Sequence, residues 1–220
     1  MDAKPNFQVN DPLWRQKVKA GLTEMIRYHS KACLESHILM PTHEKELTAN
    51  THDIPVYGFW LTLVLLSTES MHIILKTHFN FSTLKPILNK IFANQSIEIT
   101  MEIGESFMNE FSNLYGTKIR NELNNIGVPT GMSLPLLTRG FDNFFFEENF
   151  RILRNQSENA VNSDHHHLSG AWSFSTGPTH FFYTVEIDIM SAKTFENLSQ
   201  FIEWSPKDLE NMGTSQLEFL

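Results

Sequence analysis

Apolar and polar positions alternate along the first third of the chain with a helical period, and then with a pattern typical of strands. Apolar residues recur mostly three to five positions apart after Pro12, which predicts a helix from Pro12 to about Ile38. Two runs rich in β-branched and aromatic residues follow, separated by a polar tetrapeptide at 67–70. They predict a β-hairpin with strands near 56–66 and 71–78, and the polar stretch 41–55 before it reads as a linker.

The rest of the chain predicts one long helix, two shorter helices and three strands. The long helix runs from about 97 to 126 and stops at Gly127, because glycine readily takes the left-handed conformation that ends helices. The shorter helices are expected at 84–93 and 192–204, and the strands at 132–139, 172–174 and 180–189. Strands come in pairs with helices grouped between them, which predicts an α+β fold rather than alternating βαβ units.

The composition is that of a globular, acidic chain. Its 220 residues suggest one domain, or one domain with an appended segment, and a hydrophobic content of 41% is enough to bury a core. The net charge of −8, without a run of basic residues, argues against a nucleic-acid or anionic-membrane partner. The longest apolar run is far too short to span a bilayer. Cys33 is the single cysteine, so no internal disulfide is expected, and a cytoplasmic location fits best.

The long helix carries the most informative pattern. At about 100° per residue, one polar stripe collects Ser106, Glu110, Asn113 and Thr117. The predicted core face opposite it comprises Phe107, Met108, Phe111, Leu114, Tyr115, Ile119, Leu123 and Ile126. Any amphipathic helix has a polar face, but this stripe lacks the Glu/Lys mixture of a solvated surface. It places a carboxylate and a carboxamide at i and i+3, where both side chains can enter one pocket.

The spacing Glu-x-x-Asn is not distinctive by itself. It occurs twice, as Glu110/Asn113 and Glu122/Asn125, and the composition alone predicts roughly as many by chance. On the wheel, the second pair falls within the apolar arc and near the end of the helix, where fraying is expected. Only the first pair lies on a continuous polar face, and it is therefore the candidate site.

The stretch from Ser106 to Pro135 resembles the signature of the CheC/CheX/FliY chemotaxis phosphatases. That signature is an Asp or Ser, three residues, Glu, two residues, Asn, and a proline just over twenty residues later; Ser106, Glu110, Asn113 and Pro135 fill these positions. Gly127 and the Ser-Leu-Pro sequence that ends at Pro135 most resemble CheX. The order of predicted elements over about 55–190 matches as well. The resemblance implies a CheX/CheC-like α+β fold, with an antiparallel β-sheet packed against long helices.

The resemblance also implies an activity. Proteins of this family hydrolyse the aspartyl-phosphate of CheY, so the implied partner is a phosphorylated CheY-like response regulator in chemotaxis or another two-component pathway. Carried over by position, Asn113 is the catalytic amide that orients the attacking water, and Glu110 contacts the regulator's active-site lysine. Ser106, Asn109 and Thr117 are the expected partner-binding residues. No cofactor of the chain's own and no metal site are implied, because the Mg²⁺ belongs to the regulator.

Three features depart from the family pattern. The family often has glycine four residues after the catalytic Asn, whereas this chain has Thr117, with Gly116 before it. The segment 141–170 is longer than expected. The first helix contains no Glu-x-x-Asn, so a single site is predicted, as in CheX.

The resemblance also divides the chain and suggests its assembly. We expect an N-terminal tail, helix and linker at 1–50, a CheX-like phosphatase domain at 51–205 to which the first helix also belongs, and a C-terminal tail at 206–220. By analogy with CheX, we expect a homodimer. The predicted strands around 56–78 and 180–189 offer edges that could pair between subunits.

Other candidate chemistry is weaker. Asp164-His165-His166-His167 has ligand-type side chains, but consecutive residues point in different directions and no second cluster has metal-ligand spacing, so a polar loop is the favoured interpretation. Cys33 is expected to be a small packed residue rather than a reactive thiol. The aromatic cluster at 141–146 fits core or dimer packing better than an exposed partner surface.

Two alternatives to a phosphatase stay open at the level of the sequence. The first is a non-catalytic binding module of the same fold, which binds a receiver domain or another signalling protein; Thr117 and the long 141–170 segment favour it. The second is a structural protein in which the motif occurs by chance. Burial of Glu110 and Asn113 would support the second alternative.

Overall fold

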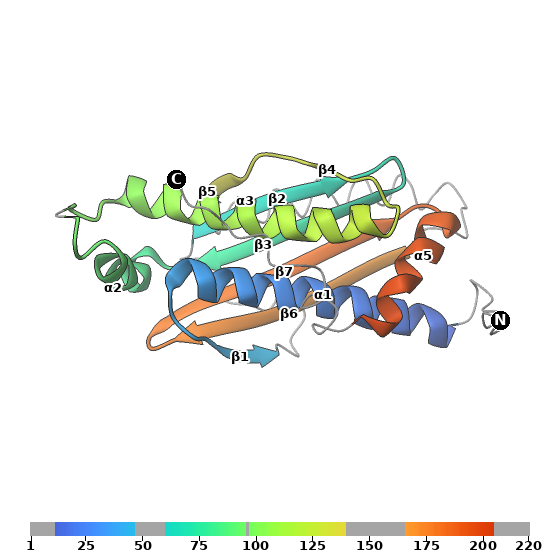
Figure 1. Cartoon of the computed structure of the whole chain (residues 1–220), viewed down its shortest axis with the longest axis horizontal. Helices are drawn as coiled ribbons and strands as arrows, with labels where there is room; N and C mark the ends of the chain where they lie inside the picture. Colours follow the sequence, from blue (N-terminus) through green and yellow to red (C-terminus); the bar gives the residue numbers. More distant parts are fainter. Residues whose placement is uncertain (1–11, 47–59, 96, 140–165, 205–220) are drawn as a thin grey trace.

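A seven-stranded antiparallel sheet forms one layer of the molecule (Figure 1). The computed structural model describes residues 12–46, 60–95, 97–139 and 166–204. The strands are β1 (His43–Glu46), β2 (Trp60–Ser67), β3 (Met71–Phe79), β4 (Gly131–Met132), β5 (Leu136–Arg139), β6 (His166–Thr176) and β7 (Thr179–Ile189). Their order across the sheet is β1-β6-β7-β3-β2-β4, and β5 pairs with β2 beside β4.

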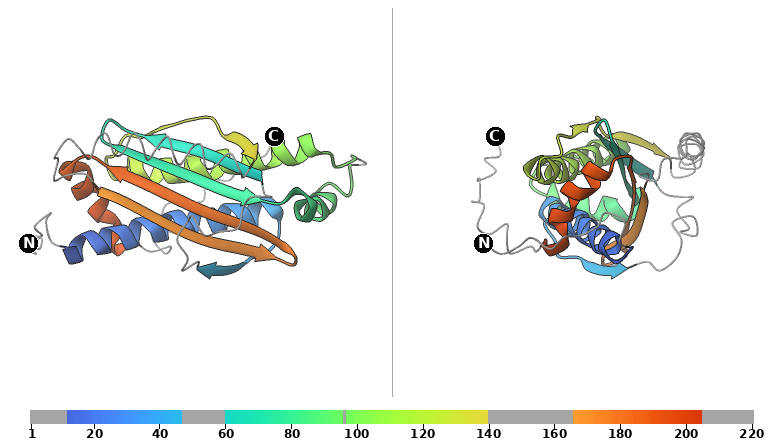
Figure 2. Two further views of the ribbon diagram at one scale, coloured as in Figure 1. Left: turned by 180° about the vertical axis from the view of Figure 1, so that it is seen from behind. Right: turned by 90° about the vertical axis from the view of Figure 1, so that its right-hand side faces the viewer.

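The helices form the second layer. In the described residues they are α1 (Pro12–Ile38), α2 (Phe81–Ile91), α3 (Met101–Asn125), α5 (Ala192–Leu198) and the 3₁₀ helix η3 (Ser199–Glu203). The long helices α1 and α3 lie side by side on one face of the sheet and run in opposite directions, with α5 and η3 at one end and α2 at the other (Figures 1 and 2). None of the helices in the described parts of the chain is both long and apolar enough to cross a membrane.

The core lies between the long helices and the central strands. Alternate residues of β6 and β7 point toward the helices, and their large rings pack together: the Trp172 and Tyr183 rings are stacked, with centroids 6.1 Å apart. Phe111 and Tyr115 of α3 meet Tyr183 edge-on from above. The sequence prediction of an α+β fold with an antiparallel sheet packed against long helices is confirmed.

Most predicted elements are present, and the helix boundaries have local causes. The predicted helix from Pro12 to Ile38 is confirmed as α1, and the hairpin as β2 and β3. α3 begins at Met101 rather than at 97. Thr100 has an extended backbone conformation and is the N-cap residue, so the helix cannot include residues 97–100. It ends where predicted, since Gly127 has φ of +75°.

Some predicted boundaries are wrong. Residues 43–46 of the expected linker form β1, which pairs with β6. The single strand expected at 132–139 is two short strands, and the strand expected at 172–174 extends over all of β6. The last helix changes to 3₁₀ geometry after Leu198. The expectations for 1–11, 47–59, 140–165 and 205–220, which include the aromatic cluster, the C-terminal tail and most of the long segment, lie outside the described residues.

The expectation that strands around 56–78 and 180–189 offer free edges is also wrong. β3 pairs with both β2 and β7, and β7 pairs with both β3 and β6, so these strands occupy the middle of the sheet. The sequence pattern predicted the β2–β3 hairpin but not the pairing of β3 with β7, because pairing between distant strands leaves no local pattern.

Candidate functional site

The face of α3 that packs on the sheet is rotated slightly from the predicted one. The buried residues are Gly104, Met108, Phe111, Ser112, Tyr115, Gly116, Ile119 and Leu123. Five of them belong to the predicted core face. The other three predicted residues, Phe107, Leu114 and Ile126, are only half-buried. The prediction also missed Gly104, Ser112 and Gly116.

Two small residues cause this rotation. The Ser112 hydroxyl donates a hydrogen bond to Thr62 Oγ1 on β2, 2.7 Å away, and both side chains are buried. A Cβ atom at Gly116 would lie 3.0 Å from Met132 Sδ and 3.1 Å from Val64 Cγ1, so only glycine fits there without displacing a neighbour. Gly116 therefore serves packing within this chain.

The polar stripe lies on the side of α3 away from this contact. Ser106 and Glu110 are exposed, and Asn113 and Thr117 are half-buried. Among the described residues, nothing hydrogen-bonds to the side chains of Glu110 and Asn113. The side chains of the candidate pair are therefore available to another molecule, which counts against the structural alternative that requires both to be buried.

Asn109 and Thr117, the other two expected partner-binding residues, are half-buried. The carboxamide oxygen of Asn109 is buried and has no hydrogen-bond partner among the described residues, so this oxygen is not available to a partner in this conformation. The Thr117 hydroxyl lies 3.9 Å from Met132 Sδ in the short strand β4. Thr117 therefore lies near β4, whereas the Asn109 oxygen is enclosed.

The Ser-Leu-Pro sequence of the signature has a structural role here. The Ser133 backbone N–H donates to the Leu65 carbonyl at 2.9 Å, and the Leu65 N–H donates to Ser133 Oγ at 3.0 Å. Ser133 therefore keeps the break between β4 and β5 in register with β2. Leu134 projects from this break and is exposed.

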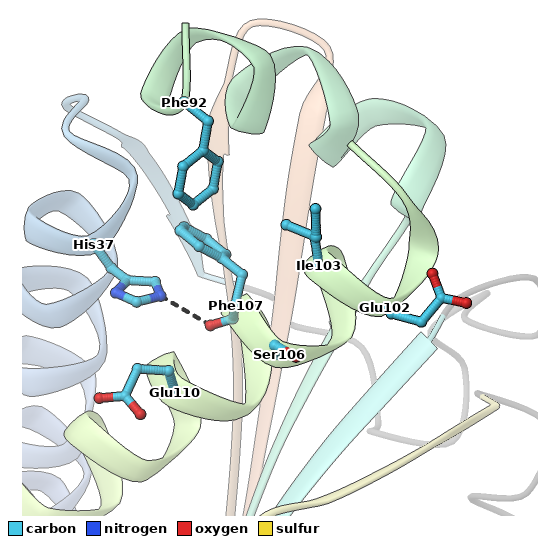
Figure 3. Close-up of a pocket in the computed structure, with 7 residues that line it drawn as sticks. All are labelled: His37, Phe92, Glu102, Ile103, Ser106, Phe107 and Glu110. Atoms are coloured by element: carbon cyan, nitrogen blue, oxygen red, sulfur yellow. Dashed lines mark hydrogen bonds between the residues drawn. The ribbon is translucent and has the colours of Figure 1, made fainter. Parts of the chain in front are cut away.

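A shallow, open pocket of about 360 Å³ adjoins the stripe on its other side, toward α1 (Figure 3). Its apolar lining comes from Phe92, at the end of α2, and from Ile103 and Phe107 of α3. The polar residues around it are His37, Glu102, Ser106 and Glu110. Figure 3 shows the Phe92 and Phe107 rings facing each other and the two glutamates on opposite sides of the pocket.

His37 joins α1 to this part of α3. Its Nε2–H donates to the Phe107 carbonyl at 2.9 Å, and its ring lies 4.0 Å from the Phe107 ring. Burial lowers the pKa of His37, although the carbonyl and the negative charge of Glu110 act in the opposite direction. A hydrogen bond from the Thr100 side chain lowers the pKa of the exposed Glu102 carboxyl. The pocket lining therefore has a neutral His37 and negatively charged carboxylates near neutral pH.

The second Glu-x-x-Asn pair has a different environment. Glu122 Oε1 lies 3.2 Å from His29 Nε2 of α1, and both side chains are largely buried. Asn125 is exposed and is the last residue of the helix. Glu122 therefore connects the two long helices, which supports the choice of the first pair made from the sequence.

The weaker candidates form no site in the described part of the chain. His167 pairs with Asp188 across β6 and β7 at 2.9 Å, and the His166 ring packs on Phe195. Within the described residues, no three His, Cys, Asp or Glu side chains are grouped so that they could hold a metal ion. Burial raises the pKa of the Cys33 thiol to about 11, so this thiol is protonated at neutral pH.

Sequence reasoning did not find the pocket. Glu110 and Ser106 were candidates, but His37, Phe92 and Ile103 were not, because they come from three separate helices. Only the packing of α1 and α2 against α3 brings them together, and no local pattern in a single sequence encodes that packing.

Comparisons with known proteins agree with this architecture at the level of the fold. No protein-family model matches the sequence, and no curated protein is detectably similar to it in sequence. Among solved structures, a CheC-like superfamily protein from Shewanella sp. PV-4 is 14% identical with a TM-score of 0.50, and the match covers 76% of this chain and 97% of that one. Chemotaxis protein CheX from Vibrio vulnificus is 10% identical with a TM-score of 0.52, and the match covers 76% and 98%.

A third similar structure comes from a different assembly. A chain of the FliM–SpeE complex from H. pylori is 8% identical with a TM-score of 0.53, and the match covers 89% of this chain and 99% of that one. Each match spans nearly the whole of the other protein. The chain therefore has the fold shared by CheC-like and CheX chemotaxis proteins.

Proposed function

We propose that this protein is a CheX-like phosphatase that hydrolyses the aspartyl-phosphate of a CheY-type response regulator in the cytoplasm. Asn113 orients the attacking water, and Glu110 contacts the regulator's active-site lysine. Ser106, Thr117 and the amide nitrogen of Asn109, whose oxygen is enclosed, contact the partner around them. The regulator supplies the Mg²⁺, and the phosphatase contributes no cofactor.

The chemistry suits the two side chains. An acyl phosphate is already activated for hydrolysis, so the helper protein need not supply a nucleophile. It has to hold a water molecule in line with the phosphorus atom, and a carboxamide can do this because it both donates and accepts hydrogen bonds. A carboxamide carries no charge, so it can approach the phosphoryl group without electrostatic repulsion. A carboxylate one helical turn away can pair with a lysine.

The single observation that supports this proposal most is the availability of the Glu110/Asn113 pair. Both side chains lie on the outward stripe of a 25-residue helix, neither is buried, and neither is hydrogen-bonded by a described residue. Short side chains on such a helix can enter a narrow acidic cleft of a partner at low entropic cost. The fold shared with CheC-like and CheX chemotaxis proteins supports the same proposal.

The test measures the loss of phosphate from receiver domains of the same organism, each phosphorylated with acetyl phosphate, with and without this protein. We expect at least one receiver to lose phosphate faster. Asn113→Ala should remove the acceleration, because no other side chain on the stripe can replace the carboxamide.

The matched control is Asn125→Ala, which removes the amide of the second Glu-x-x-Asn pair. It should leave the acceleration unchanged, since Asn125 is exposed at the helix end and Glu122 is engaged with His29. Equal activity of wild type and Asn113→Ala would contradict the assigned role, and no acceleration of any receiver would refute the phosphatase proposal.

A non-catalytic binding module of the same fold is the second candidate. The observation that favours it is Thr117, which occupies the position of a frequent family glycine and is half-buried beside Asn113. Tight binding of a receiver domain without any change in its phosphate lifetime would select this function over the first.

A further inference from the structure

The pocket between α1, α2 and α3 is lined by apolar side chains, although it lies beside the polar stripe. Phe92, Ile103 and Phe107 are each half-buried and form an apolar floor that opens to solvent (Figure 3). The side chains pack against the core from one side only. Leaving such rings open to water costs free energy that a partner's apolar group would recover.

The charged carboxylates that the described residues place around this floor are all negative. Glu102 and Glu110 are exposed on opposite sides of the pocket, and both line its edge beside the apolar floor. Among the lining residues that the structure describes, the only basic side chain is that of His37, whose ring donates to the Phe107 carbonyl and is neutral near neutral pH. A positively charged group on a partner would therefore be attracted to the rim, and a negative one repelled.

We propose that this pocket anchors the partner protein through one large apolar side chain that stands beside a lysine or arginine. The apolar side chain lies on Phe92, Ile103 and Phe107, and the neighbouring cation meets the rim carboxylates, chiefly Glu102. This inference rests on the proposed function, since the partner is the regulator addressed by Asn113. The pocket supplies affinity and orientation, while the stripe supplies the chemistry.

The pocket and the stripe are adjacent on α3, which allows one partner to occupy both. Ser106 and Glu110 belong to both the pocket and the stripe, so a partner seated in the pocket extends directly over the next turn of α3, where Asn113 lies. His37 fixes the pocket wall because it bonds the backbone of α3 from α1. A buried apolar anchor with a polar, charged rim is the usual arrangement of an energetically dominant contact.

The pocket can be tested without any regulator, by NMR titration with two small probes. 4-Phenylbutylamine carries an aryl ring and a cation, and 4-phenylbutyrate carries the same ring and an anion. At millimolar concentration we expect the amine to shift the Ile103 methyl signal and the Ser106 and Phe107 amide signals. The carboxylate should bind at least about fivefold more weakly, because the rim carboxylates repel it.

Charge reversal provides the matched control for this titration. Glu102→Lys should remove or reverse the preference for the amine. Glu196→Lys makes the same change on exposed α5 at the far end of the molecule and should have no effect. Equal binding of the two probes, no shift of these signals with either probe, or the same effect from both variants would overturn the inference.

Steady-state kinetics with the phosphorylated receiver separates the pocket from the catalytic proposal. Phe92→Ala should raise KM about tenfold and leave kcat within about twofold, whereas Asn113→Ala should lower kcat and leave KM nearly unchanged. Met190→Ala, which removes an exposed apolar side chain elsewhere, should change neither. An unchanged KM for Phe92→Ala would overturn the pocket inference alone, and an unchanged kcat for Asn113→Ala would overturn the catalytic role alone. If Phe92→Ala fails to fold, the probe titration of the wild type still decides.

Discussion

Asn113 and Glu110 differ from the other polar residues of α3 in what surrounds them rather than in their chemical type. Glu122 is held by His29, Ser112 by Thr62, and the Asn109 oxygen is enclosed, whereas Glu110 and Asn113 are left free by the described residues. Sequence periodicity was sufficient to select the pair that the structure leaves accessible, because a stripe on one helix depends on the helical repeat alone. It could not show which polar residues are engaged, since each engagement comes from a distant segment.

His37 allows a prediction about pH at the scale of one residue. Burial lowers the pKa of His37, so the folded state binds a proton there less readily than the unfolded state does. Above the ordinary histidine pKa of about 6.5, His37 is neutral in both states and its titration costs no stability. As pH falls from there toward the lowered pKa, the unfolded state binds the proton first, so the free energy of unfolding decreases. Glu110 opposes this loss but does not reverse its direction.

The measurement is the free energy of unfolding by urea between about pH 7.5 and pH 5.5, for wild type and His37→Gln. Glutamine can still donate to the Phe107 carbonyl but does not titrate. The stability advantage of the wild type should therefore shrink as pH falls. An advantage that grows on acidification would mean that His37 is stabilised in its charged form, contrary to the environment described here.

At the scale of an element, the position of α3 on β2 depends on the Ser112–Thr62 hydrogen bond and on Gly116. Ser112→Ala should lower the free energy of unfolding by about 1–3 kcal/mol, because it leaves the buried Thr62 hydroxyl without a partner. The double variant Ser112→Ala/Thr62→Val removes both polar groups and should recover part of that loss. Chemical denaturation of the four proteins of this cycle measures the coupling.

The same cycle shows whether the stripe and the core are separable. Because Ser112 faces β2 and not the stripe, the folded fraction of Ser112→Ala should keep the kcat of the wild type. Additive effects of the two substitutions on stability would contradict the hydrogen bond, and a large fall in kcat at full folding would place Ser112 in the site.

At the scale of the whole molecule, the order and type of the elements were predictable because helical and strand periods are local. The strand order was not, and β3 and β7 proved central. β1 was missed because its four residues, His43–Glu46, carry no apolar alternation and pair through their backbone with β6. The pocket was missed for the same reason as the strand order, since it exists only where three helices meet.

Assembly is also a property of this scale. We expect a homodimer at micromolar concentration, as the resemblance to CheX implies, although the central strands cannot supply the edge. In the described part of the sheet, β1 and the β4–β5 pair are the outermost strands, and exposed strand edges favour pairing with a second chain. Sedimentation velocity measures this directly, and a single monomeric species at that concentration would count against it.

The central claim is that the Asn113 carboxamide speeds the hydrolysis of an aspartyl-phosphate on another protein. The most direct measurement is the half-life of a phosphorylated receiver under single-turnover conditions, with this protein in excess over the receiver. We expect wild type and Asn125→Ala to shorten the half-life equally and Asn113→Ala to leave it at the value of the receiver alone. A half-life shortened as much by Asn113→Ala as by the wild type would contradict the claim.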